Sequence, residues 1–279
     1  MNGAARVITS NATAAGSLVF LALLVTTAFF SGWLTPYDPN MQDLSSAKIP
    51  PCPAHPLGTD FQGGDVLSKI VAGSRQVVAI ALGVSLLTVA AGFLVGLVAG
   101  YRGGWVDAAL MRTVDIMLAF PSLLLNIVLV AVLGAGFWSL FLALTLSGWA
   151  PVARITRSLV LSLAGTEYVA CAKALGATGR RVLVAHIVPN CSSTIVIVFA
   201  MRAGTAVLGA SALNYLGLGD PADTNAWGTM VNLGQYDIVT AWWWPLFPAT
   251  AIALTVAAMN LLADALRDYL DPRMKAGME

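Results

Sequence analysis

The chain has 279 residues, of which 58% are hydrophobic and only 10% are charged. A soluble domain carries roughly 25% charged residues because polar groups must cover its surface, so this composition excludes a soluble enzyme, a disordered linker and a collagen-like rod. The net charge of +1 offers no basic excess for nucleic acid, and we predict an all-α, polytopic membrane protein whose main environment is the lipid bilayer.

Six apolar segments are long enough to cross a hydrocarbon core of about 30 Å, which needs roughly 20 helical residues. In chain order they are residues 13–34, 77–100, 114–134, 137–156, 191–213 and 243–265. The first could be a cleaved signal peptide, but its long apolar stretch and the lack of a small-residue cleavage site favour a retained span.

These spans divide the chain into three expected parts. Residues 1–76 form an N-terminal segment with the first transmembrane helix and an extracytoplasmic loop. Residues 77–265 form a core of five transmembrane helices, and residues 266–279 form a C-terminal tail.

Glycine, proline and tryptophan residues add local expectations to several spans. Gly92, Gly96 and Gly100 are spaced four residues apart, which lets helix backbones approach closely in lipid. Pro121 lies within the third span and is predicted to kink or break it. The tryptophan run at residues 242–244 lies at a predicted span end, where amphipathic rings favour the membrane–water interface.

The basic residues indicate the orientation of the spans. With the N-terminus inside, eleven basic residues are cytoplasmic and three are outside. The cytoplasmic set is Arg6, Arg102, Arg112, Arg154, Arg157, Lys173, Arg180, Arg181, Arg267, Arg273 and Lys275, against Lys48, Lys69 and Arg75 outside. This positive-inside bias predicts that both termini and the loop 157–190 are cytoplasmic.

The loop 157–190 contains a predicted short helix at residues 167–176. Thr166 is the expected N-cap, and Glu167 places negative charge in the first turn, where the helix dipole favours it. Alanines give the segment high helix propensity, and Gly176 supplies a left-handed stop. Taken by itself, this segment fits either an ordinary loop between spans or a small helix suited to a groove on another protein.

The loop resembles the signature loop of ABC-importer permeases, Glu-Ala-Ala, three residues, Gly, nine residues, Ile-x-Leu-Pro. The matching residues are Ala170-Cys171-Ala172, Gly176 and His186-Ile187-Val188-Pro189, with the Gly-to-Pro spacing preserved. Further segments resemble the second, C-type permease of the dipeptide, oligopeptide and nickel importers. They are His55–Asp60, Gly64–Lys69, Trp149–Arg157, Leu213–Gly219, Trp227–Met230 and Asn260–Arg273. Gly64 replaces the usual Arg, and Ala210 stands where the family often has an acidic residue.

The resemblance implies a type I ABC importer permease fold with six transmembrane helices in the inner membrane of a prokaryote. It implies a subunit without its own active site, whose partners are a sibling permease, one or two ATPase subunits and an extracytoplasmic substrate-binding protein. ATP and Mg would be bound by the ATPases, and no cofactor or metal by this chain. The sequence agrees, since it has no phosphate-binding loop and its three cysteines fall in no metal-binding or disulfide spacing.

The candidate site residues form three groups. The ATPase-coupling loop comprises Glu167, Ala170, Cys171, Ala172, Lys173, Gly176, Arg180 and Pro189. Arg202 is a base inside a span, so it is expected either to line the translocation pathway, to pair with a partner subunit, or to form an internal ion pair. Asp220, Asp223, Trp227 and Asp237 either contact the binding protein or simply solvate an outer loop.

Peptides are the expected cargo, with nickel chelates, haem or another small cargo as alternatives. An ion-coupled secondary transporter is the rival from another class, and it would need ionisable residues deep in the spans or paired broken helices. A structural or assembly subunit of the membrane is the third interpretation.

Overall fold

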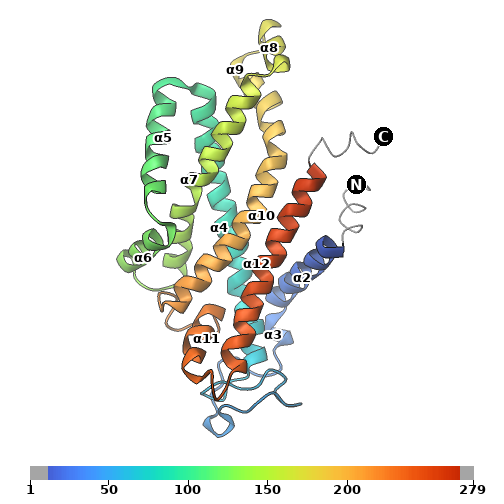
Figure 1. Ribbon diagram of the computed structural model, residues 1–279, viewed down its shortest axis with the longest axis vertical. Coiled ribbons are helices and arrows are strands. Elements are labelled where there is room, and N and C mark those ends of the chain that lie inside the picture. The colour runs from blue at the N-terminus through green and yellow to red at the C-terminus, as the bar shows by residue number, and fades with distance from the viewer. Residues whose placement is uncertain (1–11, 271–279) are drawn as a thin grey trace.

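The computed structural model describes residues 12–270, which form a bundle of long helices without a β-strand (Figure 1). The long helices are α2 (Ala12–Phe29), α4 (Val66–Arg102), α7 (Phe137–Ala164), α10 (Val188–Tyr215) and α12 (Trp243–Leu270). All five are long and apolar enough to cross a membrane, with α10 extended at its start by shorter helices. The all-α membrane fold predicted from composition is therefore confirmed.

The segment predicted as the third span is not one helix but two. Helices α5 (Gly104–Ala119) and α6 (Ser122–Leu133) are bent by 90° relative to each other, and together they make the sixth candidate span. Pro121 explains the break, because its ring disfavours helical backbone in the preceding residue and its nitrogen cannot donate a hydrogen bond. Phe120 is accordingly extended, with φ −94° and ψ 136°.

Two helices continue well beyond their predicted apolar segments. Helix α4 begins at Val66 rather than near residue 77, because the carboxylate of Asp65 accepts a hydrogen bond from the Ser68 backbone N–H at 2.8 Å and caps the helix. The expected boundary at residues 76–77 therefore falls inside a helix. Helix α7 extends to Ala164, past the predicted end at residue 156. Hydropathy marks the part of a helix in lipid, whereas caps set its ends.

Helix α4 packs along α7 through glycines, as their spacing predicted. A Cβ atom at Gly92 would lie 2.6 Å from the carbonyl oxygen of Trp149, and one at Gly100 would lie 3.0 Å from that of Arg157. The absence of side chains at these positions therefore lets the two backbones approach within the membrane.

Short helices lie at the two ends of the bundle. Helix α8 (Glu167–Ala174) occupies one end, and α9 (Gly179–Val182) and the π-helical turn η2 (Leu183–Ile187) connect it to α10. At the other end lie α3 (Ser31–Leu34), η1 (Leu44–Ser46), α11 (Trp227–Gly234) and η3 (Gln235–Asp237) (Figure 1). The start of α2 and the end of α12 point toward the α8 end, which agrees with the predicted topology; the basic residues alone assign that end to the cytoplasm.

Candidate functional site

The predicted loop helix is present as α8, which begins at Glu167. Thr166 stands at the N-cap with extended backbone, but its side chain does not cap the helix. The Thr166 hydroxyl instead donates to the carbonyl oxygen of Leu163 at 2.5 Å. The capping expectation is thus wrong, because this hydroxyl bonds to a carbonyl at the end of α7, which also accepts the Thr166 backbone N–H at 3.1 Å, instead of to α8.

Gly176 ends α8 as the sequence predicted. Its φ is +86°, in the left-handed region that favours glycine. The Gly176 N–H donates to the Lys173 carbonyl and the Ala177 N–H to the Ala172 carbonyl, each at 3.0 Å. These two bonds form a Schellman motif, which satisfies the last carbonyls of the helix and turns the chain back toward the bundle.

The loop is anchored to the bundle by a small apolar cluster. Val169, Val182 and Ile187 are fully buried, in one cluster with Leu97 of α4 and Val160 of α7. This packing holds α8 against the ends of two spans, so a force applied to α8 acts directly on the helices that cross the membrane.

Two further contacts shape the connection from α8 to α10. The Tyr101 hydroxyl donates to the carbonyl oxygen of Gly179 at 2.7 Å and ties the loop to α4. At the other end, Pro189 has no N–H to offer the carbonyl four residues earlier, and the turn before it is π-helical, with the Val188 N–H reaching back to Leu183. Pro189 thus marks the joint between the loop and α10.

Large apolar side chains are exposed on α8 and at its C-cap. Leu175, the C-cap residue, is 88% exposed and Tyr168 is 42% exposed. The predicted coupling residues Glu167, Ala170, Cys171, Lys173, Gly176, Arg180 and Pro189 are exposed as well, and Ala172 is half-buried. A cluster of exposed apolar side chains at the end of a bundle is typical of a surface that another protein covers.

Ion pairs link α5 to α7 near the loop. Arg157 donates through both Nε and Nη2 to the carboxylate of Asp107, at 2.5 and 2.6 Å. Arg154 pairs with Asp115 at 2.5 Å. The sequence identified both arginines as topology-setting charges and as part of the family-like segment Trp149–Arg157, but it did not predict their long-range partners. The pairs fasten the first half of the broken span to α7.

Arg202 lies on α10 and lines a cavity of about 350 Å³. It forms no ion pair or hydrogen bond with any group of residues 12–270. Within this part of the chain, the expectation of an internal ion pair is therefore wrong. The cavity is bounded by α4, α6, α7 and α10, together with the end of α5.

At the opposite end, the acidic residues of the outer loop have local structural partners. Asp220 and Asp223 accept backbone N–H groups two residues ahead, at 2.9 and 3.0 Å, and so form turns. Burial raises the pKa of the Asp223 carboxyl above its usual value. Asp237 pairs with Lys48 at 2.7 Å and links the two outer loops. Whether these carboxylates also contact a binding protein stays a prediction.

Tryptophans at this end are more buried than the sequence indicated. Trp227 is only 2% exposed, and its indole donates to the carbonyl of Ile70 at 3.0 Å, so it packs in the core and its expected place on a contact surface is wrong. The run at residues 242–244 lies at the start of α12, at a span end as predicted, but Trp243 and Trp244 are buried in the same hydrophobic cluster and only Trp242 is half-exposed.

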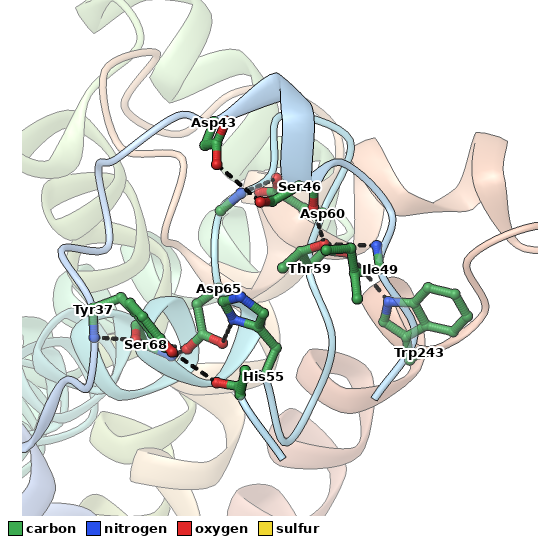
Figure 2. Close-up of polar contacts among 12 residues, drawn as sticks. Tyr37, Asp43, Ser46, Ile49, His55, Thr59, Asp60, Asp65, Ser68 and Trp243 are labelled. Atoms are coloured by element: carbon green, nitrogen blue, oxygen red, sulfur yellow. Dashed lines mark hydrogen bonds and ion pairs between the residues drawn. The ribbon is translucent and has the colours of Figure 1, made fainter. Parts of the chain in front are cut away.

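The motif residues in the loop before α4 and in its first turn form a buried polar network (Figure 2). Asp65 accepts from the hydroxyl of Ser68 at 2.7 Å and lies 3.0 Å from the His55 ring. Asp60 and Lys69 form an ion pair with both side chains almost fully buried. The sequence identified these residues by their resemblance to family segments. In the structure, their side-chain contacts hold the outer loop on α4.

The buried polar network also reaches α12. The Thr59 hydroxyl donates to the carbonyl oxygen of Ser46 at 2.6 Å and accepts from the Ile49 N–H at 2.8 Å. The Thr59 carbonyl accepts from the Trp243 indole at 3.1 Å (Figure 2). The long loop is therefore joined to the last span through a buried tryptophan.

The sequence matches two protein families. Residues 92–276 match the binding-protein-dependent transport system inner membrane component, and residues 2–51 match the N-terminal TM domain of oligopeptide transport permease C. The chain belongs to the family of binding-protein-dependent transport system inner membrane components. It is 39% identical to the glutathione transport system permease protein GsiD of Pectobacterium atrosepticum, over 95% of this chain and 88% of the relative.

Two further relatives match the same share of this chain. The oligopeptide transport system permease protein OppC of Bacillus subtilis is 37% identical over 95% of this chain and 87% of its own length. The di/tripeptide transport system permease protein DppC of Pseudomonas aeruginosa is 36% identical over 95% and 89%. The predicted resemblance to a C-type permease is thus confirmed, and the chain is an integral inner membrane protein of a family of transport permease subunits.

Proposed function

We propose that this permease imports peptides as part of an ATP-driven transporter. It forms the translocation pathway with a sibling permease, receives cargo from an extracytoplasmic binding protein, and couples to one or two ATPase subunits that bind ATP and Mg. The peptide cargo is inferred from the relatives named for glutathione, oligopeptide and di/tripeptide transport. Both termini and α8 are assigned to the cytoplasm by the positive-inside rule.

The observation that carries the coupling proposal is the set of exposed apolar residues on α8 and at its C-cap. Leu175, Tyr168 and Ala170 face outward, while Val169 on the same helix is buried against the bundle. A groove on an ATPase subunit that covers this face removes apolar surface from water, which favours association. Because Val169 is anchored beside α4 and α7, movement of the ATPase is transmitted to the spans.

The opposite end offers a second exposed apolar surface for the binding protein. Val239 is 90% exposed and Tyr236 is 82% exposed, beside the half-exposed Trp242. Neither Tyr236 nor Val239 was singled out from the sequence, which placed only Trp242 at a span end, because a short apolar segment between spans resembles the end of a span. They join Asp220, Asp223 and Asp237 in the proposed contact surface, from which the buried Trp227 is removed.

The native thiols provide a direct test of the coupling surface. Cys171 is exposed on α8, and Cys52 lies half-buried in the outer loop at the far end. A maleimide reagent should label Cys171 readily in the isolated permease, and assembly with the ATPase subunits should slow this labelling by at least about 10-fold, since a covered thiol is inaccessible. Labelling of Cys52 serves as the internal control and should not change with the ATPase. Equal labelling of Cys171 in both states would refute docking at α8.

Transport itself is tested with the assembled complex in proteoliposomes. Uptake of a labelled tripeptide should require the binding protein on one side and ATP on the other, and should persist when ion gradients are collapsed. Uptake that follows an ion gradient without ATP would instead support a secondary transporter.

A further inference from the structure

The cavity beside Arg202 concentrates features that favour an anion inside the membrane. Arg202 is the only charged side chain among the described residues that line it. A guanidinium held in a span without a counter-charge is costly, so such residues mark substrate or ion pathways. No acidic group among residues 12–270 reaches Arg202 to offset this cost.

The break in the third span places a helix N-terminus at the same cavity. Ser122 and Leu123, in the first turn of α6, line it, and no side chain caps this helix. The N–H groups of a first turn have no acceptor within the helix, and the dipole places partial positive charge there. Half-helices in transporters use such ends to bind anionic groups of substrates. Arg202 and the start of α6 therefore both favour a negatively charged group in the cavity.

Three buried polar atoms at the cavity have no hydrogen-bond partner in the described chain. They are Ser85 Oγ, Thr88 Oγ1 and Asn126 Oδ1, and all three side chains are more than nine-tenths buried. Leaving a buried donor or acceptor unpaired is destabilising, so groups of this kind are normally satisfied by water or by a bound molecule.

A backbone acceptor joins them on α7. Pro151 lies inside this helix and cannot donate to the carbonyl of Ser147 four residues earlier. Both residues line the cavity. The Ser147 carbonyl and the Asn126 oxygen are suited to accept N–H groups, while Arg202 and the start of α6 are suited to an anion. The cavity thus combines an anion-binding site with neighbouring acceptors for N–H groups.

We propose that this cavity binds the terminal carboxylate of the transported peptide, with the Arg202 guanidinium as the principal partner. A planar guanidinium matches a carboxylate through two parallel hydrogen bonds, and the peptide N–H groups adjoining the carboxylate meet the acceptors of α6 and α7. The volume of about 350 Å³ lies at the low end of ligand sites, which suits one end of a peptide rather than the whole chain. This inference rests on the proposed role of the subunit in forming the translocation pathway.

The first test measures the charge preference of the cavity without cargo or ATP. Thr205 lines the cavity beside Arg202, and in the Thr205→Cys variant the new thiol is treated with an anionic or a cationic methanethiosulfonate. Mass spectrometry of the peptide bearing residue 205 separates this reaction from those of the native thiols. The anionic reagent should react faster by on the order of 10-fold, because a single-sign cleft concentrates counter-ions. Arg202→Gln should abolish this preference, and Arg202→Lys should retain most of it.

Leu208→Cys on the same helix is the matched control, because Leu208 lies outside this cavity. Its reaction should show no charge preference that depends on Arg202. A thiol at residue 205 that reacts with neither reagent, or whose preference survives Arg202→Gln, would overturn the proposal.

The second test asks whether the anion is the carboxylate of a peptide. In the assembled transporter, trialanine should slow modification of the thiol at residue 205, whereas trialanine amide should not. Equal protection by both peptides, or by neither, would overturn the assignment. ATP-dependent uptake is measured separately. A complex that retains the charge preference but transports nothing would contradict the proposed function and still support an anion-binding cavity.

Discussion

Replacing Gly176 by alanine tests whether the end of α8 sets the coupling surface. The backbone at Gly176 has φ +86°, and a left-handed conformation costs a residue with a Cβ roughly 1–2 kcal/mol. A Cβ here would meet no heavy atom within 4 Å, so no steric clash adds to this cost. Alanine also reduces the entropy of the unfolded chain, which returns about 0.4–1 kcal/mol. The net loss is about 1 kcal/mol, or roughly fivefold in the population of the ordered loop end.

Hydrogen exchange measures this loss directly. The amides of residues 176 and 177 make the two Schellman bonds, so their exchange in Gly176→Ala should accelerate about fivefold, and transport coupled to ATP hydrolysis should fall by no more than that factor. Gly165→Ala is the matched control, because Gly165 has φ −87° and its Cβ would sit at an ordinary 3.7 Å from its neighbours.

The substitution Gly176→Asn sharpens the test, since asparagine tolerates left-handed backbone. It should behave closer to wild type than Gly176→Ala. Wild-type exchange in Gly176→Ala, or an equal defect in Gly176→Asn and Gly176→Ala, would refute the account of Gly176 as a backbone requirement.

Three further predictions concern contacts between distant segments. A double-mutant cycle on Arg157→Gln and Asp107→Asn should give a coupling free energy of about 1.5 kcal/mol in unfolding, as expected for charged hydrogen bonds; additive single effects would contradict the pair. Asp60→Asn should cost roughly 3–5 kcal/mol because it leaves the buried Lys69 ammonium unpaired, and a Tm equal to wild type would refute this. Trp243→Phe should cost about 1 kcal/mol in denaturant unfolding through the lost indole hydrogen bond, and an unchanged midpoint would contradict that role.

Several features of the fold and the site were predictable from the sequence because they depend on neighbouring residues. Apolar length predicts the spans, and Pro121 predicts the break in the third, which the structure shows as a 90° bend. The alanine-rich segment at residues 167–176 predicts α8, and Gly176 predicts its left-handed end, although the expected Thr166 side-chain cap is absent. Each of these follows from hydrogen bonds or torsion angles within a few residues, so a linear pattern is enough to reveal it.

Other features were decided only by the tertiary structure, because they depend on which distant residues meet. Trp227 belongs to an outer loop in the sequence, yet its side chain is buried and its indole donates to the carbonyl of Ile70 on α4. Arg157 is a topology-setting charge in the sequence, and only the placement of α5 beside α7 gives it Asp107. The sequence by itself determined that Arg202 is a charge in a span. Only the arrangement of five helices around it left that charge unpaired at a polar cavity, since burial and pairing are properties of the assembled bundle.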